Sequence, residues 1–416
     1  MMKKFQPLLL ILALVSCLFL TSCSDPSEVN FVSKYHIDLS ADSDISAALQ
    51  KAIDELPDGG TLFLEDGTYP LEHTINFKEN MTLKLHDNAI LLNRSAKKNP
   101  IMALNHPMNH SEARGSSNIT LEGGIWDLNG QLDESESPIH LPQLESVNAL
   151  GFGYASNVVI RNITFRDCLN GHVMQFAAMD NVLVENCRFE GQWFKGNGNK
   201  TRELIQIEPG SVKGYPYILV QEKRPTTNVT IHGCYFGGSK STEKYLIGIG
   251  THSQQAGVKC SDILIENCTF DNPDYAAIHF MAYDRMTIRS NTFNITDHSS
   301  QTDRYGILAD TYGSFLDPSG ADSTTELVIE GNKFQIDSPS VTGLSITTSN
   351  KSPKRIQNVT IQNNEMIANG SPIGIYLYLI EQCHLEGNTM IGFESAVTAK
   401  LCEGQILSDT EVNFIE

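Results

Sequence analysis

Tryptophan and basic residues are scarce in this 416-residue chain. It has 2 Trp, and its 30 Lys and Arg are outnumbered by 49 Asp and Glu, which gives a formal net charge of -19 at pH 7. Such a chain lacks the positive surface that nucleic-acid binding requires, so we expect no nucleic-acid partner. Charged residues make up only 19% of the chain and hydrophobic residues 40%. This composition excludes a disordered chain and is sufficient for a large buried core.

Closely spaced cysteines are also lacking. The chain has 9 Cys, and none of them forms a Cys-x-x-Cys pair. Cys17 and Cys23 lie near the N-terminus, and the odd number that remains argues against a fully paired disulfide framework. We therefore predict no structural zinc site and no metal ligands.

Long hydrophobic segments are lacking except at the N-terminus. There Lys3 and Lys4 precede an apolar stretch, Leu8 to Leu20, that is too short for a transmembrane helix and fits a secretory signal. The segment Leu20-Thr21-Ser22-Cys23 resembles the lipobox of bacterial lipoproteins. We predict that residues 1–22 are a signal peptide and that residues 23–35 are a flexible tether. The protein is then exported and attached to the membrane through a lipid on Cys23.

A nine-residue motif recurs along the rest of the chain. It starts with a polar residue, most often Asn, continues with alternating apolar residues and ends in Phe or Met, except in the weaker copy at Asn118, which ends in Trp. The shortest intervals between copies are 23 and 24 residues. This period is typical of a solenoid, in which each coil stacks its short strands on those of the next. The copies begin at Asn118, Asn157, Asn181, Asn228, Asp262, Arg285, Glu326, Asn358 and Gln382.

The seventh position of the motif is Ile163 in the copy at Asn157, then Cys in three successive copies and Asn in the four that follow. Identical side chains stacked at the strand spacing of about 4.8 Å can hydrogen-bond along the interior of a solenoid. We therefore predict buried ladders of thiols and amides, with a structural role. Their members are Cys187, Cys234, Cys268, Asn291, Asn332, Asn364 and Asn388.

An amphipathic segment precedes the repeats. Ile45, Leu49, Ile53 and Leu56 recur at helical spacing, and a stop signal follows at 57–60 (Pro-Asp-Gly-Gly). We predict an α-helix at about residues 44–56. A solenoid needs its open end covered, because its apolar interior and unpaired edge would otherwise meet water, so this helix is expected to be the N-terminal cap.

These features together resemble the right-handed parallel β-helix proteins of the pectate-lyase-like superfamily. The resemblance is carried by the segments 47–56, 59–69 (GGTLFLEDGTY), 80–92 (NMTLKLHDNAILL) and 118–130 (NITLEGGIWDLNG), followed by the repeats. It implies an all-β fold, a single-stranded right-handed parallel β-helix over residues 36–416. It also implies a polysaccharide or oligosaccharide ligand, although the fold serves lyases, hydrolases, epimerases and adhesins. The Asn-Thr-Asp, Gly-Asp-Asp and Gly-His-Gly motifs of polygalacturonases are missing.

Polar residues recur in the strand that precedes each motif. With the apolar residues of these strands pointing inward, alternation places polar side chains on the outer face of successive coils. His252 follows a strand that contains two glycines, which leave room for a ligand. The outward residues are expected to be Gln175, Gln206, Glu208, His279 and Asp310.

Further ligand-binding residues are expected around this face. His172 lies in the coil of Gln175, and Trp193 lies in the insertion after the second complete motif. Two insertions, 191–203 and 209–227, hold a concentration of basic and aromatic residues, and loops on a rigid scaffold often carry binding residues. From these insertions we predict contacts by Arg202, Lys213, Tyr215 and Tyr217.

Three functions are compatible with these residues. In a glycoside hydrolase, Glu208 and Asp310 act as the acid/base or nucleophile pair while His252 and His279 orient the substrate. In a polysaccharide lyase, Arg202 or Lys213 neutralises a uronate and His279 or Tyr215 abstracts the proton, with calcium as an optional cofactor. In a noncatalytic glycan-binding or adhesive solenoid, the polar face only binds. Acidic groups outnumber basic ones in the aligned strands, which favours hydrolysis.

Overall fold

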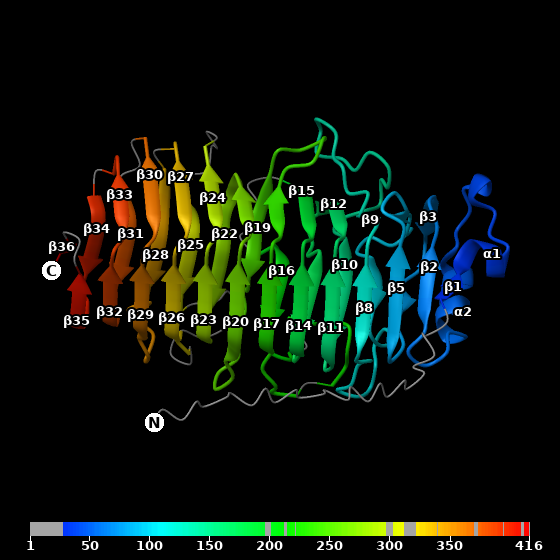
Figure 1. Ribbon diagram of the computed structural model, residues 1–416, viewed down its shortest axis with the longest axis horizontal. Coiled ribbons are helices and arrows are strands. Elements are labelled where there is room, and N and C mark those ends of the chain that lie inside the picture. The colour runs from blue at the N-terminus through cyan, green and yellow to red at the C-terminus, as the bar shows by residue number, and fades with distance from the viewer. Residues whose placement is uncertain are drawn as a thin grey trace, which may run out of the picture.

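The chain forms a β-helix in which three parallel sheets run along one long axis (Figure 1). The computed structural model describes residues 28–195, 201–211, 214–220, 222–296, 303–311, 322–338, 340–369, 373–393, 395–408 and 412–415. All the strand pairings within these sheets are parallel in the described residues, and each coil contributes one strand to each sheet in most of the molecule. The structure thus confirms the all-β, right-handed parallel β-helix expected from the repeat.

The recurring motif supplies the first strand of each coil. Within the described residues this sheet has 13 strands. They are β1 (Glu28–Asn30), β2 (Thr61–Leu64), β5 (Met81–Leu85), β8 (Ile119–Glu122), β11 (Ser156–Arg161), β14 (Asp180–Glu185), β17 (Thr227–His232), β20 (Cys260–Glu266), β23 (Tyr283–Arg289), β26 (Thr325–Glu330), β29 (Ile356–Gln362), β32 (Ile380–Glu386) and β35 (Glu403–Ser408).

The end of the motif begins the second sheet, which has 11 strands in the described part of the chain. They are β3 (Thr68–Leu71), β6 (Ile90–Asn93), β9 (Ile125–Asp127), β12 (Thr164–Leu169), β15 (Arg188–Trp193), β18 (Tyr235–Gly237), β21 (Thr269–Asp271), β24 (Thr292–Ile295), β27 (Lys333–Ile336), β30 (Glu365–Ala368) and β33 (Thr389–Ile391).

The third sheet carries the residues expected to bind a ligand, and it has 12 strands among the residues described. We call it the ligand sheet. Its strands are β4 (Ile75–Asn76), β7 (Ile101–Leu104), β10 (Asn148–Gly153), β13 (Met174–Ala177), β16 (Glu203–Glu208), β19 (Tyr245–Gly250), β22 (Pro273–Met281), β25 (Arg304–Asp310), β28 (Val341–Thr347), β31 (Ile373–Tyr378), β34 (Ser395–Lys400) and β36 (Val412–Ile415).

The polar residue that opens each motif makes the turn into the first sheet. Asn157 and Asn181 each have φ +57°, a left-handed conformation that Asn tolerates better than most residues. Their side chains also bond between coils, because Asn181 Nδ2 donates to Asn157 Oδ1 at 2.7 Å and Asn157 Nδ2 donates to Asn118 Oδ1 at 2.8 Å. The recurrence of Asn is therefore explained by backbone conformation and an external amide ladder.

The interior contains stacked side chains of the same kind. The Phe residues that end the motifs have nearly parallel rings, with centroids 4.6 Å apart for Phe189–Phe236 and 4.4 Å apart for Phe293–Phe334. The predicted amide ladder is also present: Asn291 Nδ2 donates to Asn332 Oδ1, and Asn332 Nδ2 donates to Asn364 Oδ1, both at 3.0 Å. Seven cysteines of the described residues are free thiols, six of them buried.

The N-terminal end is closed by helices. The expected capping helix is α2 (Ser46–Asp54), which buries Leu49, Ala52 and Ile53 against the first coil. The short η1 (Leu39–Ala41) precedes it. No helix in the described residues is long and apolar enough to cross a bilayer.

The prediction of a flexible tether at 23–35 is wrong for residues 28–35. Residues 28–35 form β1, which pairs with β2, and α1 (Phe31–Tyr35). Phe31 has no exposed surface and packs in the core, so the folded domain begins before residue 36. The predicted signal peptide and Cys23 lie outside the described residues, and both remain predictions.

Candidate functional site

Two rows of outward side chains cross the ligand sheet in strand register. The first, the Gln206 row, runs perpendicular to the strands through Gln175, Gln206, Gly250, His279, Leu308, Ser345 and Tyr376. The second, the Glu203 row, runs through Glu203, Ile247, Ala276, Tyr305, Thr342 and Ile373. His172 extends this second row. Met174 pairs with Ile205, and His172 and Glu203 each lie two residues before their member of that pair.

Between the two rows, the alternation of inward and outward side chains along the strand is interrupted. In β16, the neighbouring residues Leu204 and Ile205 both pack in the core, which turns Glu203 away from it. In β25, Ile307 is in the core, and a Cβ on Gly306 would lie 2.9 Å from the core ring of Phe334. Two consecutive inward positions break the alternation of a regular strand, so the Glu203 row faces outward as well.

The predicted glutamines form a buried hydrogen-bonded chain. Gln175 Nε2 donates to Gln206 Oε1 at 2.7 Å, and Gln206 Nε2 lies 3.4 Å from Glu208 Oε2. The loop that includes Gly214 covers them, since Gln175 Nε2 also donates to the Gly214 carbonyl at 3.3 Å. Both amides line a cavity beside this loop, although each residue is at most 4% exposed.

Glu208 lies under the same loop and has no exposed surface. Ser253 donates a hydrogen bond of 2.8 Å to Glu208 Oε2, while Oε1 has no partner among the described residues. A Cβ on Gly214 would come within 1.8 Å of Oε2, so glycine is required at that position. Burial raises the pKa of Glu208 to about 8, against the opposing effect of the Ser253 hydrogen bond.

The structure does not bring Glu208 and Asp310 together. Their strands, β16 and β25, are separated by β19 and β22, and three strand spacings place the carboxylates about 14 Å apart. Glycosidase carboxylates lie about 9.5 Å apart or closer. This corrects the expected acid/base pair: a covered Glu208 and a distant Asp310 cannot flank one glycosidic bond.

The tyrosines of the covering loop have different positions. Tyr215 has no exposed surface, and its hydroxyl lies 2.9 Å from His106 Nε2 in a second apolar cluster on the outer face of the ligand sheet. This corrects the expectation that Tyr215 contacts a ligand or abstracts a proton. Tyr217 reaches the cavity, where its hydroxyl accepts a hydrogen bond of 2.7 Å from Asn148 Nδ2.

A cavity of about 280 Å³ gathers several of the predicted residues. Trp193 is not among the residues that line it; its indole donates to Asp167 Oδ1 at 3.4 Å beside the 11-stranded sheet. Lys213 lies outside the described residues. The lining is made of Ser146, Asn148, Asn170, Gly171, His172, Gln175, Arg202, Gln206, Gly214, Pro216, Tyr217 and His252.

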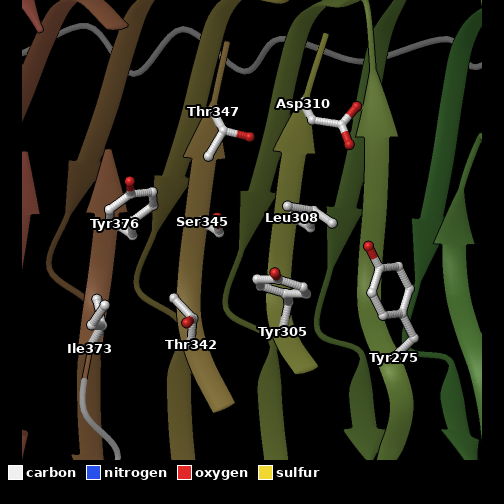
Figure 2. Close-up of a pocket in the computed structure, with 9 residues that line it drawn as sticks. All are labelled: Tyr275, Tyr305, Leu308, Asp310, Thr342, Ser345, Thr347, Ile373 and Tyr376. Carbon is white, nitrogen blue, oxygen red and sulfur yellow. The ribbon is translucent and has the colours of Figure 1, made fainter. Parts of the chain in front are cut away.

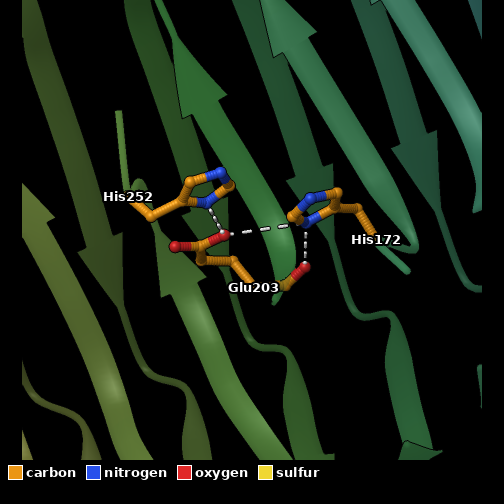
Figure 3. Close-up of side chains that lie close together, drawn as sticks. All are labelled: His172, Glu203 and His252. Atoms are coloured by element: carbon orange, nitrogen blue, oxygen red, sulfur yellow. Dashed lines mark hydrogen bonds and ion pairs between the residues drawn. The ribbon is translucent and has the colours of Figure 1, made fainter. Parts of the chain in front are cut away.

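Glu203 joins two of the predicted histidines beside this cavity (Figure 3). Its Oε2 lies 2.9 Å from His252 Nδ1 and 3.6 Å from His172 Nδ1. Burial opposes ionisation of Glu203, but the charge of His252 and its hydrogen bond outweigh that effect and lower the pKa of Glu203 to about 2. For His252, burial acts to lower the pKa, but the charge of Glu203 outweighs it and the pKa is raised. For His172, burial dominates and lowers the pKa to about 3. A buried ion pair beside a neutral imidazole results.

His279 and Asp310 form a separate pair farther along the ligand sheet. His279 Nε2 lies 3.1 Å from Asp310 Oδ2, and the His279 ring meets the edge of Tyr275 with centroids 5.8 Å apart. Asp310 borders a second cavity of about 400 Å³, which we call the tyrosine groove (Figure 2). Apart from Tyr275, which precedes Ala276 of the Glu203 row at a register irregularity of β22, its lining comes from both rows and the position two residues beyond the Gln206 row. The lining residues are Tyr275, Tyr305, Leu308, Asp310, Thr342, Ser345, Thr347, Ile373 and Tyr376.

Glu203 and the tyrosines of the groove were not predicted from the sequence. Strict alternation from Ile205 and Ile207 assigns Glu203 to the interior, and the same count from Ile307 hides Tyr305. An available signal was the residue type, because a Glu or Tyr at the start of such a strand is a poor fit to a packed interior.

Comparison with known proteins places the chain in a family. The model for the right handed beta helix region matches residues 72–293 and 151–334. Plasmin and fibronectin-binding protein A of Streptococcus pneumoniae is 30% identical over 383 residues, which cover 88% of this chain and 53% of that protein. The chain thus spans about half the length of that relative.

Solved structures agree on the fold. The surface protein and adhesin PfbA of Streptococcus pneumoniae has a TM-score of 0.85 at 27% identity, with coverage of 93% of this chain and 97% of that one. A Family 28 exopolygalacturonase of Yersinia enterocolitica has a TM-score of 0.62 at 14% identity, covering 94% and 78%, a likeness of fold alone. By its sequence match and its three-sheet architecture, the chain belongs to the right-handed β-helix family.

Proposed function

We propose that the protein is an exported, noncatalytic binding protein that holds a glycan in the tyrosine groove. The observation that carries the proposal is the groove itself, in which Tyr275, Tyr305 and Tyr376 stand on different coils beside a carboxylate and hydroxyl groups. Aromatic faces next to a few fixed polar groups suit a sugar, whose rings have apolar faces and polar edges.

Two further observations favour binding over hydrolysis. The only two carboxylates predicted to form a catalytic pair are about 14 Å apart by strand count, and one of them is covered by the Gly214 loop. The pneumococcal relative is named for binding to plasmin and fibronectin, and its solved structure is described as that of a surface protein and adhesin. An adhesive role outside the cell agrees with the signal peptide predicted from the sequence.

The test is binding of the purified chain to a glycan panel, followed by calorimetry with the best oligosaccharide. Tyr305→Ala is expected to weaken binding at least about tenfold, because it removes a central aromatic contact. Tyr235→Ala is the matched control, since Tyr235 is a half-buried tyrosine in β18 of the 11-stranded sheet, away from the groove. Equal affinity of the wild type and Tyr305→Ala, or binding to fibronectin without any glycan binding, contradicts the proposal.

Catalysis at the first cavity is the second candidate function. It is favoured by the lowered pKa of Glu203 and the raised pKa values of Glu208 and His252, because shifted pKa values concentrate in active sites and His252 lines this cavity. Reducing ends or unsaturated uronates released from the bound glycan, and lost in Glu203→Gln, would establish an enzyme instead of a binding protein. In a lyase, Arg202 at the cavity would neutralise the substrate carboxylate.

The lipid anchor is part of the proposal and has its own test. Cys23 in a lipobox-like segment supports anchoring, and the surface location named for the pneumococcal protein supports export. Expressed in a bacterium with radiolabelled fatty acid, the wild type is expected to be labelled and membrane-bound, and Cys23→Ser to be unlabelled. Equal labelling of both proteins contradicts anchoring at this residue.

A further inference from the structure

We propose that His172, Glu203 and His252 bind a divalent transition-metal ion, with Zn²⁺ as the best fit. One donor atom from each of the three side chains lies within 4.8 Å of the other two (Figure 3). The separations from Glu203 Oε2 are 2.9 Å for His252 Nδ1 and 3.6 Å for His172 Nδ1. Donors about 2.0–2.1 Å from a tetrahedral zinc lie about 3.3 Å from one another, between these two values.

The carboxylate of Glu203 is not satisfied by its protein neighbours. Its side chain has no exposed surface, and Oε1 has no hydrogen-bond partner in the described residues. A buried carboxylate oxygen without a partner is costly, and native structures supply a donor or a cation in such places. The single hydrogen bond to His252 therefore leaves part of the carboxylate available for a metal ion.

The main-chain carbonyl of Glu203 lies next to one of the three donors. His172 Nδ1 lies 2.7 Å from this carbonyl oxygen, a contact in which the Nδ1 proton bridges the two atoms. A metal ion that replaces this proton and the proton on His252 would meet two imidazole nitrogens and a carboxylate oxygen. Metal binding is expected to release protons for this reason.

The three ligands are fixed by successive coils of the solenoid. Glu203 opens β16, His172 lies just before β13 on one side, and His252 follows β19 on the other. The two imidazole rings are nearly parallel, with an interplanar angle of 9° and centroids 5.8 Å apart. Because the strands that hold them are hydrogen-bonded to each other, the donors are held in place before a metal arrives.

The donor set and its surroundings select the class of metal. Two imidazoles and one glutamate suit zinc and its neighbours, whereas Ca²⁺ and Mg²⁺ prefer ligand sets made of oxygen. Both histidines line the 280 Å³ cavity, which leaves space for water or a small ligand next to the ion. The proposal revises the sequence-based expectation of no metal ligands: the three residues are 31 and 49 positions apart, a spacing that no local motif describes.

The test uses untagged mature protein that has been treated with a chelator and then loaded with Zn²⁺ or Co²⁺. About one tightly bound ion per chain is expected, with a rise in the melting temperature on loading. The Co²⁺ form is expected to show the visible absorption of a four-coordinate site. Glu203→Gln and His252→Gln are each expected to weaken binding at least about 100-fold and to abolish the rise in melting temperature.

His279→Gln is the matched control. His279 is also buried on the ligand sheet beside a carboxylate, but it is bonded to Asp310 outside the cluster. It should bind zinc as the wild type does. Should Glu203→Gln fail to fold, His172→Gln gives the same information, checked by its circular dichroism spectrum. Undiminished zinc binding in a folded ligand variant, or no rise in melting temperature for the wild type, would falsify the proposal. Neither result bears on glycan binding in the tyrosine groove.

Discussion

Asn332 has no exposed surface and uses its amide on both sides of the interior ladder. It donates to the Ile288 carbonyl and to Asn364 Oδ1, and its Oδ1 accepts from the Asn291 backbone and side chain. Asn332→Ala leaves several buried groups without partners, so we expect it to lower the free energy of unfolding by about 2–4 kcal/mol. Thermal melts followed by circular dichroism measure the change.

Asn388→Ala is the control at the end of the same ladder. Asn388 is only half-buried: its Oδ1 accepts from the backbone and side chain of Asn364 and its Nδ2 donates to the Ile361 carbonyl, so it bonds to one ladder amide where Asn332 bonds to two. Its loss should lower the melting temperature less than the loss of Asn332 does. Equal effects of the two substitutions would mean that burial of the ladder contributes little.

The buried carboxyl group of Glu208 makes the stability of the protein depend on pH. Burial raises its pKa in the folded state to about 8, from an ordinary value of 4.5. Between these two values the folded chain keeps the proton and the unfolded chain loses it, so the contribution of Glu208 to stability falls as pH rises. Glu208→Gln removes this effect. Relative to wild type, the variant should gain on the order of 1 kcal/mol per pH unit between pH 5 and 8, measured by urea unfolding with chelator present. A pH-independent difference contradicts the assignment.

At the scale of one element, α2 closes the solenoid. Leu49 is 1% exposed and faces the first coil, whereas Lys51 on the same helix is exposed. Leu49→Glu should open this end of the molecule, lower the melting temperature by several degrees, and produce oligomers through the uncovered strand edge. Light scattering after size-exclusion chromatography detects them. Lys51→Glu adds the same acidic side chain and should leave the protein monomeric.

The strands also show how far the sequence predicts this molecule. The motif period predicts the coils and the interior ladders, because regular stacking constrains the same residue types in every copy. The helical spacing of Ile45, Leu49, Ile53 and Leu56 predicts the capping helix. The Gln206 row also follows from alternation. The Glu203 row does not, since Leu204 and Ile205 both pack in the core and this local break in the alternation is not marked in the sequence. The cover over Glu208 depends on a loop folding back, and loops carry no such periodicity.

At the scale of the whole molecule, the charge of -19 affects which glycans can approach. An acidic oligosaccharide is repelled over a range that salt shortens, from about 30 Å at 0.01 M to about 3 Å at 1 M. We expect the affinity for a uronate-containing oligosaccharide to rise with NaCl, while a neutral one of equal length changes little. Calorimetry at two salt concentrations measures both. A fall with salt for the acidic ligand would contradict this expectation and would show that attraction to nearby basic groups outweighs the net charge.

The tyrosine groove takes its residues from coils that follow one another along the long axis of the solenoid (Figure 2). Its direction is therefore that of the molecule, and lengthening the ligand by one sugar brings it over the next coil. The affinity therefore depends on the length of the polymer. It should increase with each added sugar until the groove is filled, and remain constant for longer chains.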